Sequence, residues 1–175
     1  MRTIQVEQIT EAVANMCKEA CYYLPQDVYD ALVKGKETEE SPLGRDVLDQ
    51  IIRNADIARS EDRPICQDTG MTVVFMEIGQ DVQFAGGNLI DAVNAGVAKG
   101  YIEGYLRKSV VAEPLFDRKN TTNNTPAVIY TDIVPGDKLK IKLAPKGFGS
   151  ENKSALKMLV PADGIEGVKK VVLDT

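Results

Sequence analysis

The segment PICQDTGMTVVFMEIG, residues 64–79, marks a change in the character of the chain. Its first half places a cysteine, an amide and a carboxylate side by side at Cys66, Gln67 and Asp68, followed by a threonine and a glycine. Its second half, residues 71–79, is an apolar run with β-branched and aromatic residues and predicts a strand. Three chemically capable side chains therefore stand at the entrance to a strand.

The residues before this segment have helical patterns. Apolar residues recur at steps of three and four over residues 3–24, and residues 26–34 predict a second, shorter helix that ends at Gly35. Ser41 and Pro42 are typical of a helix start, with the serine as N-cap and the proline in the first turn of a helix that runs to about Arg59. The sequence thus predicts a helical layer over residues 1–60.

The residues after the segment mix both kinds of element. Asn88 is a suitable cap for a helix that runs to about Lys108. Two strands, AVIYTDIV and KLKIKLA, are separated by the turn residues PGD and predict a hairpin. A glycine-rich loop then leads into a helix capped by Ser150, and a last helix begins near Asp163.

These patterns predict an α+β fold, with N-terminal helices followed by a mixed, largely antiparallel sheet packed with helices. We expect a single domain over residues 1–175, in which the helical layer covers residues 1–60 and the α+β part covers residues 61–175.

The amino-acid composition limits the kinds of catalytic and metal site that the chain can contain. The 175 residues include three cysteines and no histidine, and the formal charge is -5. The absence of histidine excludes Ser-His-Asp triads, Cys-His pairs and histidine-based metal sites. The acidic balance argues against a nucleic-acid partner. The polar N-terminus and the lack of an apolar run of about 20 residues predict a cytoplasmic protein with free thiols and no membrane span.

The three cysteines differ in their surroundings. Cys17 and Cys21 are four residues apart on a helix face with apolar neighbours, which favours small core residues over half of a metal site. Cys66 lies in a loop among polar residues, where a thiol can be a nucleophile, a soft-metal ligand or an incidental loop residue.

Three further features have both a functional and a structural interpretation. The loop KGFGSE, residues 146–151, is either an anion-binding loop or a tight turn between elements. Arg107 and Lys108 are either anion ligands or favourable charges at a helix C-terminus. Glycines at every fourth position, Gly96, Gly100 and Gly104, predict that another backbone packs closely against this helix.

Four blocks together resemble one family. The blocks PICQDTG, GYLRKSVV, NNTPAVIYTDIVPGDKLKI and APKGFGSENKSALKML resemble, in order and approximate spacing, the iron–sulfur (class I) fumarate hydratase and L(+)-tartrate dehydratase family. The resemblance is to the alpha subunit, or to the N-terminal half of single-chain forms, and begins at about Thr3. It implies a hydro-lyase that hydrates fumarate to malate or dehydrates tartrate to oxaloacetate, and it leaves the choice between these acids open.

The resemblance also implies roles for single residues. Three cysteines of the family hold a four-iron four-sulfur (4Fe-4S) cluster whose fourth iron binds substrate, and Cys66 matches the first of them. Gln67 and Asp68 are then substrate-binding residues beside that iron, and Asp68 is also a candidate catalytic residue. Arg107 would pair with a substrate carboxylate, and Gly149 would line the same pocket.

The chain departs from the family pattern in two respects. The second and third cluster cysteines are not among these residues, and Cys17 and Cys21 stand in the wrong place to replace them. The chain is therefore expected to be the N-terminal portion of an alpha subunit, with an incomplete cluster and no turnover by itself. A beta subunit or C-terminal domain would supply the catalytic base in a homo- or hetero-oligomer. Phe148 stands where many relatives carry a third glycine.

Two other hypotheses remain open. The chain could be a non-catalytic interaction module whose glycine-striped helix forms a subunit interface. It could also be a thiol or metal-binding protein that uses Cys66, although no other cysteine lies nearby in the sequence to resolve a disulfide.

Overall fold

A computed structural model describes residues 1–175, except for the side chains of Ser150 and Glu151, so the expected cap at Ser150 lies outside the described part. The elements in chain order are β1 Arg2–Gln5, α1 Val6–Tyr22, α2 Gln26–Thr38, α3 Pro42–Glu61, β2 Met71–Gly79, β3 Val82–Ala85, α4 Leu89–Glu103, β4 Val128–Val134, β5 Leu139–Lys146, the 3₁₀ turns η1 Gly149–Lys153 and η2 Pro161–Asp163, and α5 Gly164–Asp174.

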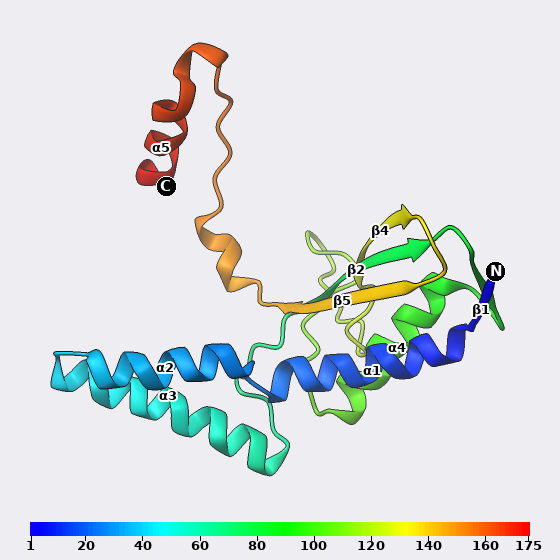
Figure 1. Cartoon of the computed structure of the whole chain (residues 1–175), viewed down its shortest axis with the longest axis horizontal. Helices are drawn as coiled ribbons and strands as arrows, with labels where there is room; N and C mark the ends of the chain where they lie inside the picture. The colour runs from blue at the N-terminus through cyan, green and yellow to red at the C-terminus, as the bar shows by residue number, and fades with distance from the viewer.

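The α+β class is confirmed. The helices α1 and α4 lie side by side against a three-stranded sheet of order β4-β2-β5 (Figure 1). Strand β2 is central and runs parallel to β4 and antiparallel to β5, while β1 and β3 form a separate parallel pair. The sheet is mixed, as expected, but antiparallel pairing does not predominate, because two of these three pairings are parallel.

The predicted hairpin of β4 and β5 is wrong, because β2 lies between these two strands. The connecting turn instead crosses the end of β2, where the Gly79 amide donates to the carbonyl of Lys138 at 2.8 Å. A Cβ on Gly79 would lie 2.3 Å from the Gly136 carbonyl oxygen, so a glycine is needed at this crossing. The two outer strands are about 10 Å apart, a gap that four connecting residues can span.

Local sequence explains most of the boundaries. The strand expected over residues 71–79 forms as β2, with Val74, Met76 and Ile78 buried on the face toward the helices. Both predicted caps form: Ser41 accepts from the Gly44 amide at 3.3 Å, and Asn88 accepts from the amides at the start of α4.

Other boundaries differ from the expectation. The first helix begins at Val6 because residues 2–5 pair with β3, and α2 continues through Gly35 to Thr38. Helix α4 ends at Glu103, and the glycine-rich loop leads into η1 rather than into an α-helix.

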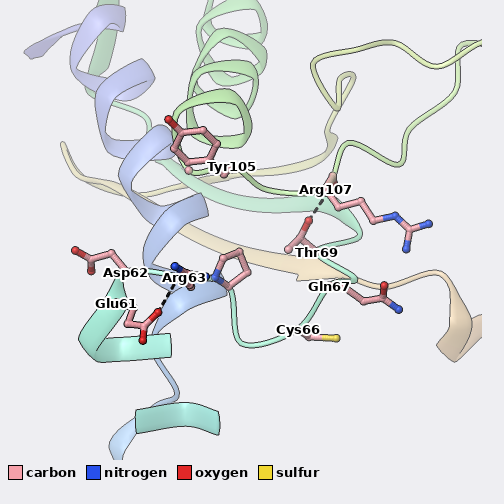
Figure 2. Close-up of a pocket in the computed structure, with 10 residues that line it drawn as sticks. Glu61, Asp62, Arg63, Cys66, Gln67, Thr69, Tyr105 and Arg107 are labelled. Carbon is pink, nitrogen blue, oxygen red and sulfur yellow. Dashed lines mark hydrogen bonds and ion pairs between the residues drawn. The ribbon is translucent and has the colours of Figure 1, made fainter. Parts of the chain in front are cut away.

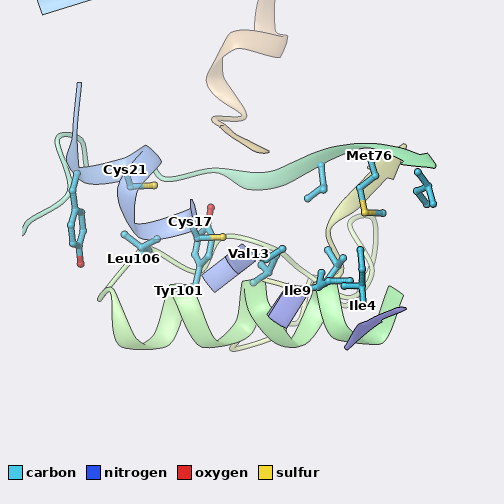
Figure 3. Packing of buried hydrophobic residues seen from close by; sticks show 13 residues of the cluster. Ile4, Ile9, Val13, Cys17, Cys21, Met76, Tyr101 and Leu106 are labelled. Atoms are coloured by element: carbon cyan, nitrogen blue, oxygen red, sulfur yellow. The ribbon is translucent and has the colours of Figure 1, made fainter. Parts of the chain in front are cut away.

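The core lies between α1, α4 and β2 (Figure 3). The glycines of α4 face α1 of the same chain: a Cβ on Gly96 would lie 2.6 Å from the Thr10 carbonyl oxygen, and one on Gly100 would lie 2.7 Å from that of Ala14. The close backbone approach that the glycine repeat predicts is confirmed, but its partner is α1. The hypothesis that this stripe forms a subunit interface is therefore wrong.

This packing makes Gly100→Ala strongly destabilising. The added methyl group would collide with the backbone of α1, and overpacking of this kind costs about 1–3 kcal/mol of unfolding free energy. The matched control is Gly35→Ala in α2, where the new Cβ would meet only a Leu48 methyl group at 3.9 Å and the change should stabilise the chain by up to about 1 kcal/mol. Urea unfolding of both variants measures the difference, and equal effects would contradict the close packing.

Two parts of the chain extend from this body. Helices α2 and α3 form an antiparallel pair, and α5 stands apart beyond the 3₁₀ turns (Figure 1). None of the helices in the described part of the chain is both long and apolar enough to cross a membrane.

Candidate functional site

The loop between α3 and β2 and the segment after α4 border an open cavity of about 640 Å³. Cys66, Gln67 and Arg107 line this cavity, and in Figure 2 their side chains extend in the same direction from the two segments. All three residues are exposed. The structure thus brings together a thiol, an amide and a guanidinium group, although Cys66 and Arg107 are 41 residues apart in the sequence.

Buried polar contacts fix the two segments to each other. The Thr69 hydroxyl donates to the Arg107 carbonyl at 3.0 Å, and the Tyr101 hydroxyl donates to the Thr69 carbonyl at 2.6 Å. Burial raises the pKa of Tyr101 above its ordinary value, so this phenol stays neutral and serves as a hydrogen-bond donor. The backbone that carries Arg107 is therefore tied to the loop that carries Cys66.

Asn124 joins a third segment to the same place. Its side chain is fully buried, and its backbone is left-handed, with φ of 62°. The side-chain amide donates to the Gly70 carbonyl at 3.0 Å, and its oxygen accepts from the amides of Ser109 and Val110 at 2.8 and 3.1 Å. One buried side chain thus satisfies three backbone groups from the two site-forming segments.

Asp68 turns toward a neighbouring cavity. Its carboxylate accepts from the Gly70 amide at 3.1 Å, and a Cβ on Gly147 would lie 2.8 Å from one of its oxygens. Asp68, Arg107 and Phe148 all line this second cavity, whose volume is about 560 Å³. Arg107 therefore borders both cavities, with Cys66 and Gln67 in the first and Asp68 in the second.

Gly149 lines neither of these two cavities. It begins η1 next to Phe148, and a Cβ at this position would meet no other atom within 4 Å. The glycine-rich loop approaches the site through Phe148, so the role of Gly149 in substrate binding stays a prediction.

The cysteines show how far this chain fits an iron–sulfur cluster. Burial raises the pKa of Cys17 to about 12 and that of Cys21 to about 11, so both remain protonated core residues, in agreement with the structural interpretation of their spacing. Cys66 is exposed at the cavity and can act as a thiolate ligand. No group of three or more cysteine and carboxylate residues in the described part of the chain could hold a metal ion. This chain therefore fits one cluster ligand and not a complete set.

The residues that order the site are less visible in the sequence than those that line it. Asn124 lies in the polar run NTTNNTP, which reads as a solvated loop, and Tyr101 shares the apolar stripe of its helix. Gly70 did carry a signal in the sequence, because a glycine directly before a strand indicates an unusual backbone or a close contact. In the structure its φ is +56°, and a Cβ there would lie 2.0 Å from the Lys146 carbonyl oxygen.

Comparison with known proteins agrees with the family resemblance of the four sequence blocks. Residues 10–175 match the family described as fumarate hydratase (Fumerase). The chain is 40% identical over 173 residues to a protein of Methanocaldococcus jannaschii that is provisionally named an L(+)-tartrate dehydratase subunit alpha, covering 96% of this chain and 60% of that protein. It is 34% identical over 174 residues to the L(+)-tartrate dehydratase subunit alpha of Escherichia coli O157:H7, covering 97% and 56%. The corresponding subunit of Escherichia coli K12 is 31% identical over 173 residues, covering 97% and 56%.

The chain thus spans less than two thirds of the length of these relatives. The match nevertheless extends over nearly all of its own residues and includes both segments that form the first cavity. The chain belongs to the fumarate hydratase family.

Proposed function

We propose that this chain is part of the alpha subunit of an iron–sulfur-dependent hydro-lyase that acts on a small hydroxydicarboxylate. The observation that carries the proposal is the cavity shared by Cys66, Gln67 and Arg107 in a chain of this family. A thiolate is a common ligand of iron in a cluster, and a guanidinium group pairs with a carboxylate of the substrate. The two groups therefore match the two requirements of such a reaction, which are to hold the cluster and to bind the acid.

Cys66 would hold one iron of the cluster, and the remaining ligands would come from residues outside these 175. When bound, a cluster with an open iron position supplies a Lewis acid for the hydroxyl group that leaves as water. The lengths of the relatives leave room for further ligands, since the chain covers only 56–60% of them.

The other residues would bind and orient the acid. Arg107 can donate two parallel hydrogen bonds to one substrate carboxylate, and Gln67 can both donate to and accept from substrate oxygens. Asp68 is held by the Gly70 amide and lines the second cavity together with Arg107, where its carboxylate can orient the substrate hydroxyl or accept its proton. With no histidine in the chain, acid–base work falls to such groups or to the partner.

The names of the relatives favour L(+)-tartrate as substrate and a second subunit as partner. Hydration of fumarate is the alternative reaction, which the family description favours. Assays of both reactions with the assembled, anaerobically reconstituted enzyme separate them. If a protein with a full cluster turned over neither acid, the proposal would be refuted.

Replacement of the guanidinium group gives a sharper test. We expect Arg107→Gln to lower kcat/KM of the assembled enzyme by roughly 100-fold, because a charge-assisted pair with a substrate carboxylate is lost. Arg53→Gln on the exposed face of α3 is the matched control and should leave kcat/KM unchanged. Wild-type kcat/KM in Arg107→Gln would exclude this residue from substrate binding.

A further inference from the structure

The second cavity contains groups that the proposed reaction does not use. Besides Asp68 and Arg107, it is lined by Arg118 and Ser109, and the rest of its wall is apolar: Met71, Val110, Val111, Pro114 and Phe148. Two guanidinium groups and one carboxylate face a space of about 560 Å³, so its formal charge is positive.

Arg118 is held in place by an ordered loop. The loop closes through a bridge between Val111 and Asn120 and through the Ala112 amide, which donates to the Lys119 carbonyl at 2.8 Å. Arg118 itself has a left-handed backbone, with φ of 48°, and one terminal nitrogen donates to the Pro114 carbonyl at 3.0 Å. The remaining donors of this guanidinium group are available to a ligand.

The Glu113 carboxylate of this loop is already engaged by backbone amides. The Glu113 carboxylate accepts from the amides of Leu115, Phe116 and Asp117 at 2.6, 2.6 and 3.0 Å. These backbone donors hold the pKa of Glu113 below its ordinary value. Among the side chains that the structure describes, neither Arg107 nor Arg118 forms an ion pair.

Ser109 supplies an independent observation. Its hydroxyl oxygen is buried and has no hydrogen-bond partner among the described residues. A buried polar group of this kind normally has a protein, water or ligand partner. Ser109 also lines the cavity, and its backbone amide is bound to Asn124, so the backbone of this residue has a fixed place in the wall.

We propose that Arg118 and Ser109 form a second carboxylate-binding subsite, so that Arg107 and Arg118 together bind the two ends of one small dicarboxylate. This inference rests on the proposed function for the identity of the ligand. The apolar wall suits the short carbon chain between the carboxylates, and two guanidinium groups select a dicarboxylate over a monocarboxylate of the same length.

Binding to the chain itself tests this subsite without a cluster or a partner. The probes are fumarate and crotonate, which differ in that crotonate has a methyl group in place of one carboxylate. Calorimetric titration of the wild-type chain should show at least about 10-fold tighter binding of fumarate, because one charge-assisted pair is lost with crotonate. Equal affinity for the two acids would overturn the subsite.

Variants assign the effect to residues. Arg118→Gln should weaken fumarate binding at least about 10-fold and leave crotonate binding nearly unchanged, whereas the control Arg53→Gln should change neither. Ser109→Ala should weaken fumarate binding while leaving the unfolding temperature equal or higher, because it removes an unpartnered buried hydroxyl. Wild-type fumarate affinity in Arg118→Gln would refute the proposal.

These outcomes differ from those that test the enzyme. A failed hydro-lyase proposal would show as a reconstituted assembly that turns over neither fumarate nor tartrate, whatever the chain binds. A failed subsite would show as fumarate binding that does not depend on Arg118, whatever the assembly catalyses.

Discussion

Asn124→Ala is expected to lower the unfolding free energy of the chain by about 4 kcal/mol. The change removes three hydrogen bonds and leaves the Gly70 carbonyl and the amides of Ser109 and Val110 buried without a partner. Each such group costs about 1–3 kcal/mol, and alanine also tolerates the left-handed backbone at this position less well than asparagine. For a chain of this size the loss corresponds to a fall of roughly 10 °C in the unfolding temperature.

Asn120→Ala is the matched control. Asn120 lies in the same loop, and its side chain forms two hydrogen bonds, to the Lys108 carbonyl and from the Thr122 amide, where that of Asn124 forms three, but Asn120 is exposed. Water can replace those bonds, so the control should cost less than about 1 kcal/mol. Urea unfolding of the two variants measures their unfolding free energies. Equal values would mean that Asn124 does not hold the site together.

The second large effect is on catalysis. Cys66→Ala should lower the turnover of the assembled enzyme by roughly 1,000-fold or more, since loss of an outer-shell contact to a metal site already costs about 10–100-fold. Stability should hardly change, because Cys66 is exposed and its sulfur accepts one weak hydrogen bond within its own loop, from the Asp68 amide at 3.4 Å.

The control for this variant is Cys21→Ala. Cys21 is buried in the core and its pKa is raised to about 11 by burial, so it should affect stability but not turnover. The rate of tartrate dehydration or fumarate hydration in the two variants is the measurement. A Cys66→Ala enzyme with wild-type turnover would remove this thiol from the reaction.

The sequence predicted the elements whose signals are local. The strand at residues 71–79 follows from its apolar run, the caps at Ser41 and Asn88 follow from side-chain chemistry, and the core position of Cys17 and Cys21 follows from helical periodicity. The resemblance to a family, carried by four short blocks, is confirmed by the match over residues 10–175.

Long-range features were not predictable in the same way. A short PGD turn between two strands normally closes a hairpin, but the strand order β4-β2-β5 and the close approach of Gly79 to Gly136 show that the chain crosses the end of β2 instead. The partner of the glycine stripe was equally hidden, because a glycine repeat predicts close packing without identifying the neighbouring element.

The residues of the candidate site also fall into those that the sequence could predict and those that it could not. Cys66, Gln67 and Arg107 could be singled out by residue type and by resemblance, and the structure places them at one cavity. Asn124, Thr69 and Tyr101 could not, because their importance depends on hydrogen bonds to backbone groups far away in the sequence. Arg118 has the pattern of a solvated loop charge in the sequence, and only the fold places it at one cavity with Arg107.

We propose above all that the exposed thiol at residue 66 is a ligand of the cluster. The most direct test of this claim is the iron and sulfide content of the assembled enzyme after anaerobic reconstitution, measured in parallel for Cys66→Ala and Cys21→Ala. We predict that Cys66→Ala loses most of its iron and sulfide while Cys21→Ala keeps the wild-type content. A Cys66→Ala protein with the wild-type amount of iron and sulfide would contradict the claim.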